Sequence, residues 1–234
     1  MTAGQDQMSH LSGRLTARPE ATPSSGAAIF PGTHPLTLSG GGECLLFVPS
    51  RLPADHPAPL IVTLHGAGGT AQGGLAPLLS LAENAGALLL SPGSAGVTWD
   101  VVSGGYGADV WFIDRALAEV FARFAIDTSR LAISGFSDGA SYALSLGLAN
   151  GDPFTHIIAY SPGFVTPGAR IGSPRVFISH GTGDKVLPID RCSRRIVPVL
   201  RRAHLDVDYH EFDGGHTVPA GIARQSLQWL LDDA

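Results

Sequence analysis

The segment RLAISGFSDGASYALSLGLANG, residues 130–151, contains the clearest indication of the fold. Its first part, RLAISGF, is an apolar run with the length of a buried strand, and its second part, DGASYALSLGLANG, has helical spacing and ends in Asn150 and Gly151. Ser137 lies at the junction, between Gly135 and Gly139. Gly-x-Ser-x-Gly at a strand-to-helix junction is typical of a nucleophile elbow, which presents a serine hydroxyl on a sharp turn. A chain with 30 glycines can contain this short motif by chance, so the surrounding pattern decides its meaning.

Strands and helices alternate on both sides of this segment. The expected strands are PLIVTLHG (59–66), ALLLSP (87–92), RLAISGF (130–136), HIIAYSPG (156–163), PRVFISHG (174–181) and DVDYHEF (206–212). The expected helices are LAPLLSLAENAG (75–86), DVWFIDRALAEVFARFA (109–125), DGASYALSLGLANG (138–151), IDRCSRRIVPVLRRA (189–203) and AGIARQSLQWLL (220–231), with Asp109 and Asp190 as N-cap candidates. This alternation predicts an α/β fold with a mostly parallel central sheet and helices on both faces. THPLTLSGGGECLLFVP, residues 33–49, predicts an antiparallel hairpin before it.

The length of 234 residues fits one α/β domain better than two small ones. Residues 1–28 are rich in Ser, Thr, Pro, Ala and Gly and show little periodicity, which predicts a flexible N-terminal arm. We therefore expect the arm over 1–28 and a single α/β domain over 29–234.

The composition excludes several classes of function. A net charge of −5 provides no basic field for nucleic acid, and no apolar run approaches the length of a membrane span. The arginines of residues 191–202 are interpreted as a solvated helix face. Cys44 and Cys192 have no metal-site or Cys-x-x-Cys spacing, and two free thiols are favoured over a disulfide. The N-terminus has no signal-peptide pattern, so a cytoplasmic protein is expected; a homodimer is left open.

A serine nucleophile needs a histidine base and an orienting acid, which follow it in the order Ser, Asp, His in this type of fold. Of the nine histidines, His216 alone follows Ser137 on a loop just past the last strand and after the acid candidates. Asp184, just beyond the strand ending at Gly181, is the favoured acid, and Asp213 is its rival on the loop of the histidine. The predicted catalytic residues are Ser137, Asp184 and His216.

An oxyanion hole in such a site combines two backbone N–H groups. One follows the nucleophile, here that of Asp138, and the other lies on a loop after an early strand. LHGAGG, residues 64–69, is that loop. Ala67 is the favoured second donor, with Gly66 and Gly68 as rivals, and His65 is expected to brace the loop by hydrogen bonding.

Three further residues are candidates for the substrate pocket. Trp99, Ser161 and Phe164 belong to loops at the same predicted edge of the sheet as Ser137, and packing roles for them are equally compatible with the sequence. Tyr106 and Trp111 are expected in the core.

These motifs together resemble those of a known superfamily. LHGAGG (64–69), TWD (98–100), GFSDG (135–139), SPG (161–163), HGTGDKVLP (180–188) and GGH (214–216) resemble α/β-hydrolases of the phospholipase/carboxylesterase branch, and also polyhydroxybutyrate-depolymerase and feruloyl-esterase-like serine esterases. The resemblance implies hydrolysis of carboxylic esters through an acyl-enzyme, without metal or organic cofactor. The chain lacks an insertion long enough for a large lid, which favours small or medium acyl and alcohol groups. A thioesterase or a polyester or feruloyl-type esterase is the alternative; a serine peptidase or an inactive binding module ranks below these.

Overall fold

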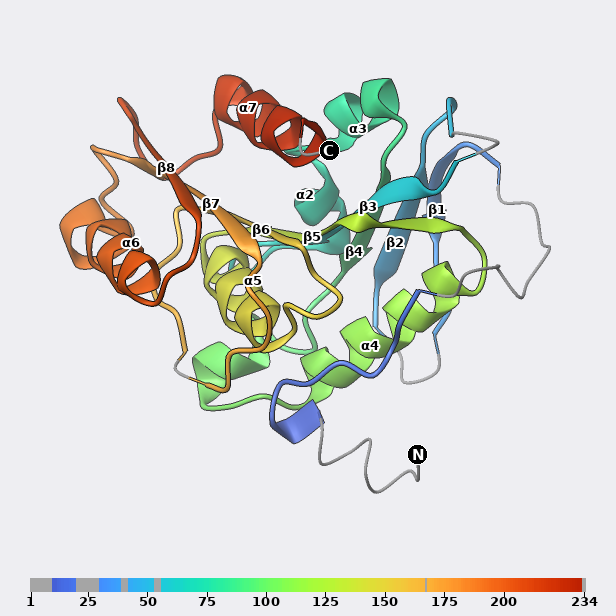
Figure 1. Cartoon of the computed structure of the whole chain (residues 1–234), viewed down its shortest axis with the longest axis horizontal. Helices are drawn as coiled ribbons and strands as arrows, with labels where there is room; N and C mark the ends of the chain where they lie inside the picture. The colour runs from blue at the N-terminus through green and yellow to red at the C-terminus, as the bar shows by residue number, and fades with distance from the viewer. Residues whose placement is uncertain (1–9, 20–29, 39–41, 53–55, 167, 233–234) are drawn as a thin grey trace.

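The computed structural model of the chain describes residues 10–19, 30–38, 42–52, 56–166 and 168–232 (Figure 1). Its centre is an eight-stranded sheet with the order β1-β2-β4-β3-β5-β6-β7-β8. The strands are β1 Gly32–Pro35, β2 Cys44–Val48, β3 Ala58–Leu64, β4 Leu88–Pro92, β5 Ile126–Phe136, β6 His156–Tyr160, β7 Arg175–Gly181 and β8 Val207–Phe212. The β1–β2 and β2–β4 pairs are antiparallel and the others are parallel, so the mostly parallel sheet and the N-terminal hairpin are both confirmed.

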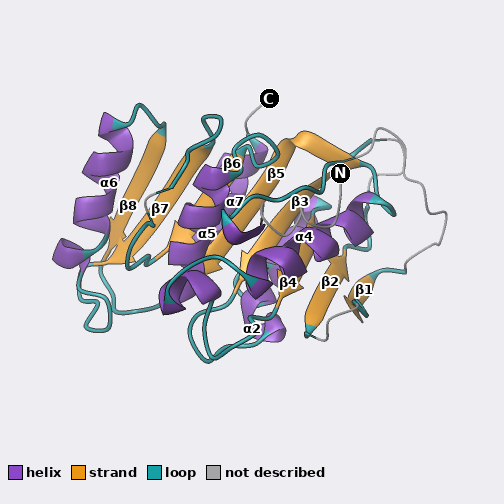
Figure 2. Cartoon of the chain, turned by 90° about the horizontal axis from the view of Figure 1, so that it is seen from below, coloured by secondary structure: helices purple, strands orange, loops and turns teal. Residues whose placement is uncertain are grey.

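Helices cover both faces of the sheet. They are α2 Ala71–Leu75, α3 Leu79–Ala85, α4 Ala108–Phe121, α5 Asp138–Ala149, α6 Ser193–Arg202 and α7 Ala220–Leu231, with short 3-10 turns η1 Asp100–Ser103 and η2 Ile189–Arg191. The helices α4, α5 and α6 lie in front of the sheet in Figure 2, whereas α2, α3 and α7 lie on the opposite side, above the sheet in Figure 1. The described helices include none that is long and apolar enough to cross a membrane.

Strand β3 shows why the sheet is covered twice. Leu60, Val62 and Leu64 point into the core shared with α4 and α5, while Ile61 points into the core shared with α3 and α7. All four side chains are at most 2 % exposed. Because successive side chains of a strand face opposite sides, a continuous apolar run with no polar alternation requires a helical layer on each face.

The structure differs from the sequence-based expectation at three helix starts. The helix expected over 75–86 begins only at Leu79, because Pro77 has no N–H to donate to a preceding turn. Asp109 does not cap α4; its buried carboxylate accepts the N–H groups of Ala95 and Asp100, at 2.7 Å each. Asp190 lies in η2, where its carboxylate pairs with Arg194 instead of capping α6.

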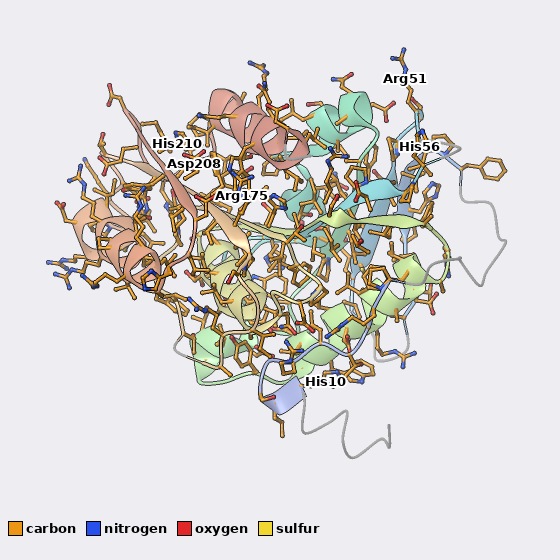
Figure 3. All side chains as sticks on the ribbon, in the orientation of Figure 1. His10, Arg51, His56, Arg175, Asp208 and His210 are labelled. Carbon is orange, nitrogen blue, oxygen red and sulfur yellow. The ribbon has the colours of Figure 1, made fainter. Side chains whose placement is uncertain are left out.

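Residues 10–19 are not part of a flexible arm. They lie along α4, as the blue trace of Figure 1 shows, and His10 is labelled at this contact in Figure 3. The Asp114 carboxylate of α4 is 5 % exposed and accepts hydrogen bonds from His10 Nε2, from the backbone and hydroxyl of Thr16 and from the backbone of Ala17, at 2.6–2.8 Å. Leu15 is buried beside them. The remaining positions of the expected arm, 1–9 and 20–28, lie outside the described residues.

We expect Asp114→Asn to lower the free energy of unfolding by about 1–3 kcal/mol, since the amide cannot accept all of these hydrogen bonds and leaves buried donors without partners. Urea unfolding at neutral pH measures the change. Glu119→Gln on the same helix breaks only the partly exposed pair with Arg123 and should change stability by less than about 1 kcal/mol. Equal effects of the two substitutions would contradict the structural role of residues 10–19.

Candidate active site

Ser137 occupies a strained turn between β5 and α5. Its backbone angles are φ 58° and ψ −120°, in the left-handed half of the map that side chains rarely adopt. The turn is fixed on both sides: the Ser137 N–H donates to the Tyr160 carbonyl of β6, and the Ser137 carbonyl accepts from Ala140 and Ser141 of α5. This geometry places the serine side chain at the carboxyl edge of the parallel strands, where ligands of such sheets bind.

Gly135 and Gly139 allow two close approaches that the turn requires. A Cβ at Gly135 would lie 2.2 Å from the Gly139 carbonyl oxygen, and a Cβ at Gly139 would lie 2.4 Å from the carbonyl oxygens of both Leu64 and His65. The helix start therefore packs directly against the backbone of the 64–69 loop. The two glycines of the motif are explained by packing, independently of any reaction.

Gly139→Ala should lower the free energy of unfolding by about 1–3 kcal/mol, because the new methyl group overlaps backbone atoms that cannot rotate away. The value of kcat/KM should fall by more than the loss of folded protein explains, since the contact joins the nucleophile turn to the 64–69 loop. Thermal unfolding and kcat/KM on a short ester measure the two effects. Gly221→Ala is the matched control: nothing lies within 4 Å of that Cβ, and stability should hold or rise by up to about 1 kcal/mol. A harmless Gly139→Ala would contradict the packing described.

His216 connects the serine to an acid. Its Nε2 lies 2.9 Å from Ser137 Oγ, and its Nδ1 lies 2.6 Å from Asp184 Oδ2. A carboxylate can only accept, so Nδ1 carries the proton and Nε2 is left to accept from the serine hydroxyl. The ring also packs against Phe136, with centroids 4.6 Å apart. The structure thus brings together the three residues that the sequence selected, in a hydrogen-bonded chain at one edge of the sheet.

Asp184 is held by its own loop. Its Oδ1 accepts the N–H groups of Val186 and Leu187, at 2.9 and 2.8 Å, while Oδ2 faces His216. Burial is the largest single influence on its pKa and acts to raise it, but the hydrogen bonds from Leu187, His216 and Val186 outweigh it and hold the pKa of Asp184 below its ordinary value. The carboxylate is therefore ionised at neutral pH.

The loops of the acid and the histidine are fastened to each other by their backbones. Thr182 donates to the Phe212 carbonyl and Gly183 to the Gly214 carbonyl, at 2.9 Å each. The rival acid Asp213 lies on the same loop as His216, but it is exposed and the described residues show no hydrogen bond between the two. Asp184, and not Asp213, is the acid that contacts His216.

The 64–69 loop is braced through His65. Its Nδ1–H donates to the Gly66 carbonyl, at 2.7 Å, and its Nε2 accepts the N–H of Ser94, at 3.1 Å. The Gly68 N–H is already bonded to the Val97 carbonyl, at 2.7 Å, which removes one of the two rivals to Ala67 as an oxyanion donor. Gly66 remains beside Ser137, with a hypothetical Cβ 3.3 Å from that of the serine.

Two of the three residues expected at the substrate pocket are fully buried. Trp99 is fully buried, stacks between His65 and Tyr142, and donates its indole N–H to the His65 carbonyl, at 2.8 Å. Ser161 is also fully buried. Phe164 is partly buried and packs against the core. The sequence places these residues on the correct edge, but burial within a loop cannot be read from it.

Sequence reasoning missed Thr98, whose hydroxyl donates to the Asp138 carboxylate, at 2.7 Å. This bond ties the 94–99 loop to the residue after the nucleophile, while Trp99 and Val97 tie it to the 64–69 loop. The only available signal was the position of Thr98 beside Trp99 in TWD. Tyr106 and Trp111 are partly buried against the core, as expected.

A largely apolar cavity of about 260 Å³ adjoins the 64–69 loop and the turn of the nucleophile. Its walls include Gly66, Ala67, Pro77, Leu78 and Phe136. At about 30 Å³ per water-sized group, it has room for about nine such groups. The described residues contain no cluster of three or more His, Cys, Asp or Glu side chains that could hold a metal ion.

Comparisons with known proteins agree with this architecture. The family model described as phospholipase/carboxylesterase matches residues 108–228, just over half of the chain. A curated relative, the probable feruloyl esterase C of Aspergillus clavatus, is 28 % identical in an alignment 172 residues long that covers 68 % of this chain and 62 % of the relative. The chain thus spans less than two thirds of that protein.

Solved structures with the same fold include two esterases. The structure of esterase PE8 matches with a TM-score of 0.65 and 23 % identity, covering 82 % of this chain and 98 % of that one. The Bacillus cereus carboxylesterase matches with a TM-score of 0.62 and 18 % identity, covering 84 % and 96 %. At these identities the likeness concerns the fold.

Proposed function

The chain belongs to the phospholipase/carboxylesterase family and has the α/β-hydrolase fold, and from this premise we propose that it hydrolyses carboxylic esters with Ser137 as nucleophile. The observation that carries the proposal is the hydrogen-bonded chain from Ser137 through His216 to Asp184, because a hydroxyl, a neutral imidazole and a carboxylate in this order make up the machinery of acyl transfer.

The reaction runs through an acyl-enzyme. Ser137 Oγ attacks the ester carbonyl while His216 Nε2 takes the hydroxyl proton, and Asp184 stabilises the imidazolium that forms. His216 then gives the proton to the departing alcohol. A water molecule, activated by the same imidazole, hydrolyses the acyl-enzyme and releases the acid.

The negative charge on the carbonyl oxygen is received by the backbone N–H groups of Asp138 and Ala67. One such donor contributes about 3–4 kcal/mol to stabilisation of the transition state. The contact of Gly139 with the backbone of Leu64 and His65 supports this assignment, since it packs the 64–69 loop against the start of α5, where the N–H of Asp138 lies.

The substrates are esters of small or medium acyl and alcohol groups. The cavity beside Ala67 and Phe136 is not lined by Ser137 or His216, but it adjoins the turn of the nucleophile, and its largely apolar walls favour an apolar group on one side of the scissile bond. The similarity to the probable feruloyl esterase of A. clavatus keeps feruloyl-type esters among the candidates, and acyl thioesters use the same machinery.

A fluorophosphonate probe tests the proposal. It should add one phosphonyl group to the peptide that contains Ser137, and the same treatment should block hydrolysis of 4-nitrophenyl acetate. Wild-type protein that reacts with neither the probe nor any member of an ester panel would contradict an esterase and favour a binding module. Faster hydrolysis of matched amides than of esters would favour a serine peptidase.

A further inference from the structure

His180 is a buried histidine that the reaction above does not use. It lies near the carboxyl end of β7, four residues before Asp184, and its side chain is fully buried. The sequence excludes it as the base because the acid candidates follow it. The structure agrees, since Ser137 Oγ is bonded to His216. A buried polar ring next to a catalytic acid requires an explanation.

The hydrogen bonds of His180 identify its tautomer. Its Nε2 lies 2.8 Å from the Leu187 carbonyl oxygen, which can only accept, so Nε2 carries the proton. Its Nδ1 then accepts from the hydroxyl of Ser193, at 2.7 Å, at the start of α6. The ring is thus saturated as a neutral imidazole.

The same Nε2 lies 3.2 Å from Asp184 Oδ2, the oxygen that faces His216. His180 therefore contacts the acid loop twice, at the Leu187 carbonyl and at the carboxylate itself. The N–H of Leu187 in turn donates to Asp184 Oδ1. The His180 ring thus contacts both the loop that orients the Asp184 carboxylate, at the Leu187 carbonyl, and the carboxylate oxygen that is bonded to His216.

We infer that His180 is a positioning residue of this centre, a neutral imidazole that fixes the 184–187 loop and keeps the Asp184 carboxylate directed at His216. The inference rests on the proposed function. Through His180, the chain of contacts that runs from Ser137 through His216 to Asp184 continues to Ser193 on α6. The reaction itself involves no residue of α6.

The charges around His180 are compatible with a neutral ring. Asp184 and His216 face it from the two loops, and Glu211 is its register partner on β8. Glu211 is already paired with Arg194, and the buried thiol of Cys192, the residue before Ser193, lies within the influence of the Asp184 charge. Burial is the main cause that lowers the pKa of His180, against the opposing effects of the Leu187 carbonyl and Asp184. An imidazolium here would compete with His216 for the carboxylate.

The test compares His180→Leu, which has no donor, with His180→Gln, whose amide restores an N–H near the position of Nε2. Rates are normalised to the fraction of serine that a fluorophosphonate titrates, so that misfolded protein is not counted. His180→Leu should lower kcat by about 10- to 100-fold with little change in KM, because a misdirected acid affects the transition state more than ground-state binding. His180→Gln should recover most of that loss.

The pH profile separates positioning from a merely structural role. The acid limb of kcat/KM reports protonation of the catalytic base. It should move to lower pH in His180→Leu, because a misdirected carboxylate stabilises the imidazolium less, and it should return in His180→Gln. His156 is also buried, but it is the first residue of β6 and so lies at the end of the strand away from the centre. His156→Leu should leave the acid limb of the kcat/KM profile unchanged. Unchanged kcat and limb in His180→Leu, or no recovery in His180→Gln, would overturn the inference.

Nitrogen NMR of the wild-type protein gives a result even if His180→Leu does not fold. His180 should show a protonated Nε2 and an unprotonated Nδ1 across the pH range in which the base titrates. A proton on Nδ1 or a charged ring in that range would overturn the inference. A wild-type protein with no Ser137-dependent turnover would instead contradict the proposed function. The NMR result would still show which nitrogen of His180 carries the proton.

Discussion

Ser137→Ala should lower kcat on a short chromogenic ester by about 10⁴- to 10⁶-fold while leaving the fold intact. The loss is large because no other group in the centre can form the acyl-enzyme, and the residual rate comes from the N–H groups of Asp138 and Ala67 acting on bound ester. The fold should survive because the hydrogen bond that the hydroxyl makes with His216 lies in a partly exposed region and the backbone turn is held by other bonds.

The measurement requires a matched serine and a check of folding. Ser145 lies two turns further along α5, where its hydroxyl donates to the Ser141 carbonyl and accepts the N–H of Thr166. Ser145→Ala should keep activity within about a few-fold, since these bonds support a loop rather than the nucleophile. Circular dichroism and the thermal midpoint compare the three proteins. Retention of more than about one per cent of kcat by Ser137→Ala would exclude this serine as nucleophile.

Asp184→Asn should be nearly as damaging, with a loss of about 10⁴-fold in kcat. The amide oxygen can still accept the N–H groups of Val186 and Leu187. Its NH₂ group then faces His216 Nδ1 and His180 Nε2, both of which donate protons in the wild type. To avoid two opposed donors, His216 must move its proton to Nε2, and it then cannot accept from Ser137. The acid thus fixes the tautomer as well as the charge.

Asp213→Asn is the control, because Asp213 is the exposed acid on the same loop as His216. It should change kcat by less than about twofold. The pH dependence gives a second check: the pKa of Asp184 is held low, so the wild-type carboxylate stays charged over the working range and its protonation does not limit activity there. A larger loss of kcat in Asp213→Asn than in Asp184→Asn would show that Asp213, and not Asp184, is the acid that orients His216.

Much of this centre could be predicted from the sequence because parallel strands bring their carboxyl ends to one edge. Ser137, Asp184 and His216 each follow a strand, so their convergence needs only the strand pattern. The contacts that lie within loops could not be predicted. Trp99 and Ser161 are on the expected edge but buried, and the position of His180 beside Asp184 results from the loop folding back through Leu187.

Local rules failed where distant contacts outweighed them. Asp109 has the residue type of an N-cap, but its carboxylate is used by the backbone of the 94–100 segment. Residues 10–19 have the composition of an arm, but His10, Leu15 and Thr16 find partners on α4 and at Asn150, which are distant in the sequence. A polar stretch can be ordered by a few buried acceptors that its own composition does not reveal.

The close packing of Gly139 on the 64–69 loop limits how such a protein can acquire new substrate preferences. A library that randomises the two glycines of the serine turn would yield mainly destabilised variants, because a Cβ at either position overlaps backbone atoms. The side chains of Val97 and Val186 are exposed, at 80 % and 67 %, while the backbone of each residue is bonded to the centre: the Val97 carbonyl accepts from Gly68, and the Val186 N–H donates to Asp184. Directed evolution should therefore begin at these two side chains, because substitutions there change the exposed surface beside the centre and leave the backbone bonds of the catalytic residues in place.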